Sequence, residues 1–292
     1  MANTVLGTIN VSVSPKRNAD MAIGMGRNLL EVLGVATIAQ AMAALKTRCN
    51  GTGIPNFAGL EIGDYIDGIS LGGIAAPNGS GAEAPSVWSS AYYNNRIVIA
   101  GFNTYKRHCD MRYNHILFSF VNAIATGRPN PSHVKAGGYV GSEIRAWLEG
   151  ADGLGGGPFA VGLKSALGGG SELLTITKYD AETASIPSAY SGQHKYTVFL
   201  PTEFEICGAS VKGLDTLITK DRAVQPIQIP LFQKSQEYLV KYKNNLALHW
   251  WTATISDETN RWCCVYSNGV MNNVNIDWAY GISPLFCIGG AL

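Results

Sequence analysis

Charge is scarce in this chain. Lysine and arginine total 22 and aspartate and glutamate total 21, so the net charge is +1, and charged residues make up only 15% of the 292. A protein that binds nucleic-acid phosphates needs a concentrated basic face to displace counterions, so we expect no nucleic-acid partner. Disorder is excluded as well, because a sequence that is 46% hydrophobic and 10% aromatic collapses into a core.

Segments that direct a protein to a membrane are also missing. Met1 is not followed by a basic region and an apolar run, so we expect no signal peptide and synthesis in the cytoplasm. Residues 29–45 are apolar, but a membrane span needs ~20 such residues, and Glu31, Gly34 and Gln40 interrupt the stretch. We expect a packed helix there and no insertion into a membrane.

The cysteines lack the spacing of a metal or redox motif. No Cys-x-x-Cys pair occurs among Cys49, Cys109, Cys207, Cys263, Cys264 and Cys287. Neighbouring residues of a strand point to opposite faces, so Cys263 and Cys264 cannot jointly bind a metal without a bulge, although one of them could meet Cys287 across strands. We expect buried thiols and no metal site; a redox or copper site is the minority alternative.

Catalytic motifs are absent too. Residues 157–165 (GPFAVGLKS) approach a phosphate-binding loop, but Leu163 separates the glycine from the lysine. Residues 24–26 (GMG) lack the third glycine of a dinucleotide-binding motif, and no Gly-x-Ser-x-Gly occurs. His108, Cys109 and Asp110 have no second pair of ligands at metal-binding spacing. We therefore expect neither an enzyme nor a cofactor.

Glycine, by contrast, is abundant, and the 34 glycines exceed the ~7% of an average protein and predict frequent turns. Apolar residues recur at helical spacing from Leu29 to Leu45. Asn18 or Asp20 can cap this helix at its start, and Asn50, which precedes a glycine, predicts its end.

Two parts of the chain differ in pattern. Residues 1–90 combine a weakly alternating arm (1–17), that helix and a loop or linker (77–90), so we expect an attachment or oligomerisation segment. Residues 91–292 form the main domain. Its predicted elements are strands at 96–102, 115–121, 173–178 and 196–200, helices at 142–148 and 158–167, a capping box at Thr202 and Glu205, and a hairpin turn at 267–269.

From residue 115 onward the order of five stretches resembles a domain of unknown function that is common in phage structural proteins. The stretches are 115–118 (HILF), 137–139 (GGY) leading to 142–145 (SEIR), 199–208 (FLPTEFEICG), 250–252 (WWT) with 267–269 (SNG), and 281–288 (GISPLFCI). The resemblance implies a C-type-lectin-like fold in its formylglycine-generating-enzyme variant. The same fold carries the variable proteins of diversity-generating retroelements, such as the phage major tropism determinant.

Two departures from that family concern arginine. The family usually has Trp-Leu-Arg-Ser and Gly-Val-Arg-Pro, where this chain has WTAT at 251–254 and GISP at 281–284. Both arginines, and any ion pair they form, are missing here. We expect an α+β protein, with the C-type-lectin-like fold in its C-terminal part and a helical or extended attachment segment before it.

The last 45 residues mix aromatic and amide side chains, a combination that provides rigid contact area beside adaptable hydrogen bonding. Asparagine is also frequent where an adenine-directed mutagenic template acts. The predicted ligand-binding residues are Trp262, Tyr266, Asn268, Asn272, Asn273, Asn275, Asp277, Trp278 and Tyr280. The alternative is that the tryptophans are core and the asparagines are turn residues. We expect Trp250 and Trp251 to be core.

Three functions remain open at this stage. The first is a phage tail or tail-fibre protein, located in the virion, whose lectin-like domain binds a host receptor, either a protein or a glycan. The second is a purely structural virion component, such as a baseplate or capsid decoration, and the third is a copper-dependent oxidase, which the neighbouring Cys263 and Cys264 disfavour. In the first two, other virion proteins are partners and a homo-oligomer such as a trimer is expected.

Overall fold

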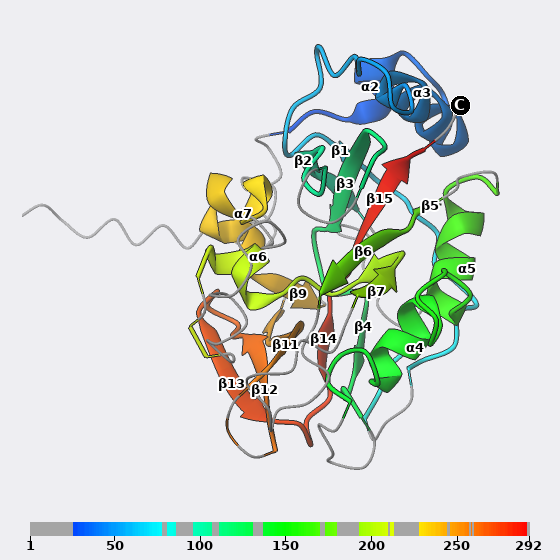
Figure 1. Cartoon of the computed structure of the whole chain (residues 1–292). Helices are drawn as coiled ribbons and strands as arrows, with labels where there is room; N and C mark the ends of the chain where they lie inside the picture. Colours follow the sequence, from blue (N-terminus) through cyan, green and yellow to red (C-terminus); the bar gives the residue numbers. More distant parts are fainter. Residues whose placement is uncertain are drawn as a thin grey trace, which may run out of the picture.

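The computed structural model describes much of the chain, and the statements below refer to that part. It comprises residues 26–77, 81–85, 96–106, 111–130, 137–169, 173–179, 193–209, 211–212, 228–243, 246–256, 258 and 260–290. The predicted arm at 1–17, the predicted helix start at Asn18 or Asp20 and most of the predicted linker lie outside these residues. The described elements form two β-sheets and several helices (Figure 1), which confirms the α+β class.

The larger sheet is built on three strands, β2, β3 and β15, that are almost entirely buried. Its strand order is β1-β2-β3-β15-β5, with β8 also paired to β15, and every pairing is antiparallel. Successive side chains of a strand point to opposite faces, so a strand whose residues are all buried is covered on both faces. Its sequence is therefore a nearly continuous run of apolar residues. The bounds are β1 Tyr65–Ile66, β2 Ile97–Phe102, β3 His115–Phe120, β5 Leu173–Leu174, β8 Val198–Phe199 and β15 Leu285–Gly289. The strands predicted at 96–102 and 115–121 are confirmed.

The smaller sheet contains the C-terminal hairpin. Its order is β13-β12-β11-β14-β4, in which β11 and β14 run parallel and the other neighbours run antiparallel. The bounds are β4 Ala125–Gly127, β11 Trp250–Ile255, β12 Arg261–Val265, β13 Met271–Asn275 and β14 Tyr280–Ile282. The turn between β12 and β13 has Gly269 at φ 82°, a conformation that glycine adopts without strain, and the predicted hairpin is confirmed.

Two short ribbons complete the strand set. One pairs β6 (Ile176–Tyr179) with β7 (Gln193–Tyr196), and the other pairs β9 (Lys241–Lys243) with β10 (Leu246–Leu248). The strand predicted at 173–178 is therefore divided between β5 and β6, and these belong to different sheets.

Helices cover the sides of the sheets, with α4 and α5 on one side and α6 and α7 on the other (Figure 1). Ser142 caps α4 and Thr202 with Glu205 forms a capping box at α6, both as predicted. The bounds are α4 Glu143–Glu149, α5 Pro158–Ala166, α6 Glu203–Cys207, α7 Pro230–Lys234 and the 3₁₀ helix η3 Gln236–Leu239. No described helix has the length and apolar character that a membrane crossing requires.

The single helix predicted through 29–45 is wrong, because the structure has two helices there. The helix α2 (Leu29–Leu33) ends where Gly34 adopts a left-handed φ of 65°. The second helix, α3 (Ile38–Cys49), begins at a capping box of Thr37 and Gln40 and ends at Asn50, as predicted. Apolar spacing continues across the break, so periodicity alone did not reveal it.

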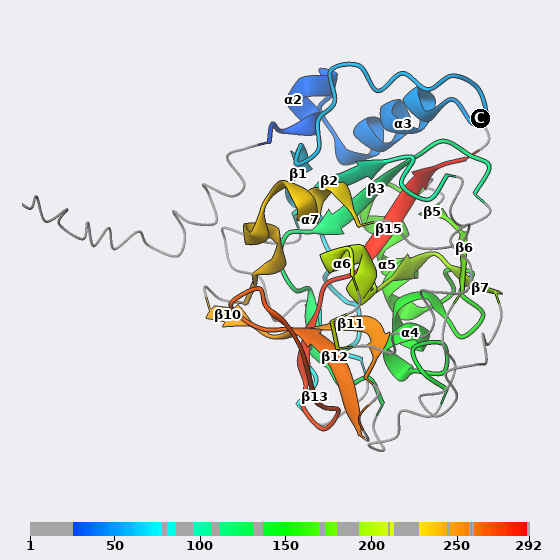
Figure 2. The same ribbon diagram turned by 60° about the vertical axis from the view of Figure 1, so that its left-hand side comes forward.

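The helix α3 packs on the larger sheet. It contacts β15 and β3, and both views place it beside the end of β15 (Figures 1 and 2). Leu45 and Cys49 are fully buried in the same core as Ile288, whose carbonyl oxygen lies 3.8 Å from the Cys49 thiol. The described part of residues 1–90 therefore shares one core with residues 91–292.

A shared core predicts a shared unfolding transition. Leu45→Ala removes a fully buried side chain and should lower the free energy of unfolding by about 3 kcal/mol, in one transition that moves both far-UV and tryptophan signals. The control is Ile54→Ala, whose side chain is 89% exposed, with an expected change below about 0.5 kcal/mol. A separate early transition confined to the helical signal would contradict the shared core.

Candidate functional site

The predicted ligand-binding residues lie along the hairpin of β12 and β13 and the segment that leads into β14. Trp278 is 61% exposed, and Asn268 and Asn275 are also exposed. Four others are partly exposed, namely Tyr266, Asn272, Asp277 and Tyr280. We call these seven residues the hairpin surface.

Two predicted residues are buried and do not belong to that surface. Trp262 is 1% exposed, and its Nε1 donates to the carbonyl oxygen of Thr252 at 2.9 Å. Asn273 is 4% exposed, and its amide nitrogen donates to Ser256 Oγ at 2.7 Å and to Glu258 Oε1 at 2.8 Å. Both faces of β12 are covered, so Trp262 follows the alternative interpretation, in which the tryptophans are core residues. Trp250 and Trp251 are core residues, as predicted.

The asparagines of the hairpin surface also have local structural roles. Hydrogen-bonded and non-hydrogen-bonded pairs alternate along an antiparallel ladder, and Tyr266 N donates to Val270 O. Asn273, on the edge strand β13, therefore directs its backbone N–H away from β12. The side-chain oxygen of Asn272 accepts this N–H at 2.9 Å, which covers an edge that could otherwise pair with another chain.

The side-chain oxygens of Asn268 and Asn275 likewise accept backbone N–H groups two residues later, from Val270 and Asp277 at 3.1 and 3.3 Å. This is the turn chemistry of the alternative interpretation. Local bonding and ligand binding are compatible, because these bonds use the amide oxygen and orient the amide nitrogen.

An aromatic cluster adjoins the hairpin surface and includes a residue that the sequence analysis missed. The ring of His249 stacks on Tyr266 with centroids 4.4 Å apart and meets the edge of Tyr280 at 5.0 Å. Tyr280 in turn lies 4.9 Å from the buried ring of Trp251. His249 precedes the Trp250-Trp251 pair in the sequence, but no local pattern places it against Tyr266, because that contact exists only across strands.

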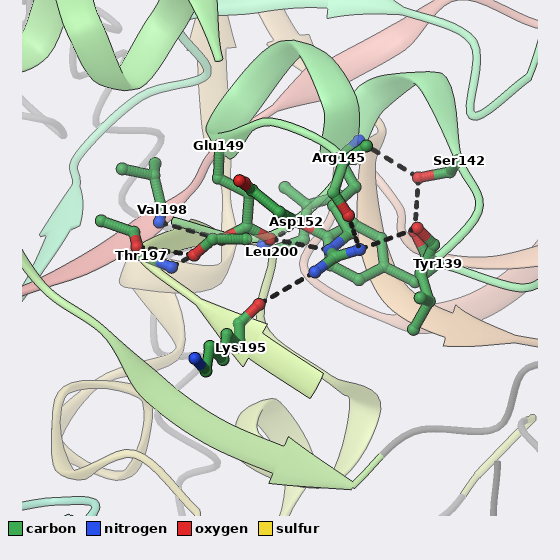
Figure 3. A network of polar contacts seen from close by, with 12 residues as sticks. Tyr139, Ser142, Arg145, Glu149, Asp152, Lys195, Thr197, Val198 and Leu200 are labelled. Carbon is green, nitrogen blue, oxygen red and sulfur yellow. Dashed lines mark hydrogen bonds and ion pairs between the residues drawn. The ribbon is translucent and has the colours of Figure 1, made fainter. Parts of the chain in front are cut away.

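A buried ion pair supports the core behind α4 (Figure 3). Arg145 Nε donates to Glu149 Oε1 at 3.0 Å, and both side chains are almost completely buried. The guanidinium also donates to three backbone carbonyl oxygens, those of Val140, Ala151 and Lys195, each at 2.9 Å. Each of the three guanidinium nitrogens therefore has an acceptor, which makes the buried charge tolerable.

The carboxylate of Glu149 also accepts several hydrogen bonds. Glu149 Oε2 accepts the backbone N–H groups of Thr197 and Val198 at 2.6 and 3.3 Å (Figure 3). Burial raises the pKa of Glu149, and the N–H of Thr197 and the charge of Arg145 act in the opposite direction. The pair thus joins α4 to the start of β8 and has no acceptor or donor positions directed at solvent, which is a structural role.

A second buried ion pair also lies close to the Tyr196 ring. Lys178 Nζ donates to Glu205 at 2.7 Å, and the hydroxyl of Tyr105 donates to the same carboxylate at 2.8 Å. The guanidinium of Arg145 and the ammonium of Lys178 lie 5.1 and 5.6 Å from the centroid of the Tyr196 ring. This ring therefore links the two ion pairs, and no sequence motif indicated either pair.

Lys241, by contrast, is buried beside a backbone carbonyl oxygen and two aromatic rings of the described residues. Its Nζ donates to the carbonyl oxygen of Phe120 at 2.7 Å and lies 5.5 Å from the ring of Trp250 and 5.9 Å from that of Phe232. Burial lowers the pKa of Lys241 to about 7.

Candidate metal ligands do not gather anywhere in the described part of the chain, where no group of three or more His, Cys, Asp or Glu side chains could hold an ion. Cys263 and Cys264 are both buried on β12, whereas Cys287 lies on β15 in the other sheet. His115 is buried, and burial lowers its pKa to about 4. His108, Cys109 and Asp110, which the sequence did not favour as metal ligands, lie outside the described residues.

Residues 115–290 match the family model of a domain of unknown function, DUF6273, and the chain belongs to this family. The matched range runs from β3 to β15 and so contains most of both sheets and the entire hairpin surface. No curated protein and no solved structure matches the chain.

The buried amine predicts a pH-dependent stability. Between pH 7 and the ordinary lysine value of 10.5 the unfolded chain binds a proton that the folded protein does not, so the stability rises with pH. Urea unfolding of the wild type should gain about 2 kcal/mol relative to Lys241→Met between pH 7 and pH 9. Because the comparison cancels all other titrating groups, parallel pH profiles of the two proteins would contradict the low pKa of Lys241.

Proposed function

We propose that this chain is a non-enzymatic virion protein of a phage tail or tail fibre that binds a receptor on the host surface. Its C-terminal part has a C-type-lectin-like fold in the formylglycine-generating-enzyme variant, and the hairpin surface is the binding face. The ordered resemblance of five stretches to phage structural proteins supports the class of protein. The mixed sheets and helices are compatible with that fold.

The exposure of Trp278 is the observation that carries the binding proposal. Trp278 is 61% exposed, so it does not contribute the stability that a large aromatic side chain provides when it is buried in a core. Tyrosine, tryptophan and amide side chains lie together here, and such sets are enriched where proteins bind partners. The seven residues carry one charge, that of Asp277, so recognition relies on stacking and hydrogen bonding.

The arrangement of the molecule suits display. The helices α2 and α3 lie at one end, and the strands β12 and β13 lie at the other (Figures 1 and 2). Attachment to other virion proteins through the N-terminal part, with assembly into a homo-oligomer such as a trimer, leaves the hairpin surface directed away from the particle.

A purely structural virion component is the second candidate. Exposed apolar side chains also occur outside the seven residues of the hairpin surface, at Ile54 (89% exposed), Leu246 (71%) and Val161 (55%). Their spread over separate elements is favourable for packing against several neighbours in a particle rather than for one binding face.

Replacement of Trp278 distinguishes these two functions. We expect Trp278→Ala to weaken binding of the purified protein to host cells by about 30-fold, equivalent to about 2 kcal/mol, without a change in folding. The matched control is Val161→Ala on α5, which removes a similarly exposed apolar side chain and should leave binding unchanged. Unchanged binding by Trp278→Ala, with loss of virion incorporation by Val161→Ala, would instead favour the structural component.

Natural variation offers an independent test of diversification. If a retroelement diversifies the hairpin surface, sequencing the 3′ end of the gene across a phage population should show substitutions clustered at codons such as those for Tyr266, Asn272, Asn275 and Trp278, with a near-identical template copy nearby. The buried Asn273 should not vary, because its amide joins Ser256 and Glu258. Evenly scattered substitutions would rule out targeted diversification and leave a receptor-binding face of fixed sequence.

A further inference from the structure

The contacts of His249 converge on the hairpin surface. Its ring stacks on Tyr266, and its Nδ1 accepts the backbone N–H of Ser267 at 3.0 Å. The rings of His249 and Tyr280 also meet in an edge contact. The backbone carbonyl oxygen of His249 accepts the N–H of Gly281 at 2.8 Å. His249, the residue just before β11, thus contacts both the end of the β12 segment and the start of β14.

The bond to Ser267 has a specific role in the turn. Gly269 N donates to Tyr266 O at 2.8 Å, which makes 266–269 a hydrogen-bonded β-turn. The N–H of the second residue of such a turn points away from the turn's own carbonyl groups, so it needs an acceptor from elsewhere. His249 Nδ1 is that acceptor, and it can accept only while it carries no proton.

The surroundings of the ring determine its protonation. Burial lowers the pKa of His249 below its ordinary 6.5, so the ring is neutral at pH 7 and gains its proton in acid. The titratable groups placed against it are the Tyr266 and Tyr280 hydroxyls, with the Cys264 thiol near Tyr280. Phenols and thiols in general carry no charge in acid, and burial is the cause of the lowered pKa of His249.

We infer that His249 is a positioning residue that holds the turn of the hairpin surface at neutral pH and releases it in acid. A protonated Nδ1 is a hydrogen-bond donor, and the backbone N–H of Ser267 is a donor too. Protonation therefore breaks the hydrogen bond between them. The imidazolium can remain stacked on Tyr266, because an aromatic face attracts a cation, so the change is confined to the turn that carries Asn268. This inference rests on the proposed function in so far as the turn takes part in binding, and it predicts weaker binding in acid.

Two variants separate the acceptor from the ring. His249→Asn retains an acceptor, because Oδ1 of asparagine is the same number of bonds from the backbone as Nδ1 of histidine, but it does not titrate. His249→Phe retains an aromatic ring and loses the acceptor. If only packing mattered, the phenylalanine variant would behave like the wild type at every pH.

Amide hydrogen exchange at Ser267 measures directly whether its hydrogen bond to His249 is present. The rates are corrected for the intrinsic pH dependence of exchange and referenced to the Cys264 amide within the ladder. In the wild type the protection of Ser267 should fall about three- to tenfold between pH 7.5 and pH 5, as expected for the loss of one hydrogen bond. His249→Asn should keep its protection at both values, and His249→Phe should lack it at both. A wild type without this fall, or a phenylalanine variant with wild-type protection, would overturn the inference.

The exchange measurement needs no receptor, so its outcome is separate from that of the proposed function. Host-cell binding of the wild type should weaken about three- to tenfold between pH 7.5 and pH 5 in step with the lost protection, whereas binding of His249→Asn should not. If protection falls but binding of both proteins remains equal at both pH values, the turn is released without regulating recognition, and the regulatory part of the inference is wrong. Failure of Trp278→Ala to change binding would contradict the proposed function and leave the exchange result valid.

Discussion

The central constraint of this structure is the complete burial of β15, the strand closest to the end of the chain. It pairs with β3 along five residues and with β5 and β8 at its other edge, and α3 covers it. A strand that is buried on both faces must satisfy every backbone group by pairing and every side chain by packing. Segments from the first, middle and last thirds of the chain therefore have to assemble around it together.

Buried charge is the second organising feature. Arg145 with Glu149 and Lys178 with Glu205 are placed where strands and helices from distant parts of the chain meet, and each of the two carboxylates has several hydrogen-bond partners. Such pairs add little net stability compared with apolar residues, but removal of one member leaves an uncompensated charge. Lys241 differs, because aromatic rings and one carbonyl oxygen surround its amine, and its low pKa follows from that difference.

The hairpin surface depends on this rigid interior. Its aromatic side chains lie just after β12, in the turn before β14 and at the start of β14, beside strands whose buried side chains include Trp250, Trp251 and Trp262, and its asparagines are oriented by bonds to backbone N–H groups. Loops that carry recognition residues are usually positioned by a rigid scaffold. In this protein the proposed recognition residues and the protection of the edge strand β13 are combined in the same few side chains, so a change at Asn272 affects both.

Local sequence signals account for the buried strands β2 and β3, the caps of α4 and α6, the Asn-Gly hairpin and the burial of Trp250 and Trp251. These depend on neighbours within a few residues, so their signals are readable in one stretch of sequence. The division of the N-terminal helix is local as well, because Gly34 and the capping box of Thr37 and Gln40 produce it, but the apolar period that continues across the break masks these signals. Tertiary structure determines that Trp262 and Asn273 are buried and that His249 meets Tyr266 and Tyr280. These features depend on which strands pair and what covers them, and no local pattern contains that information.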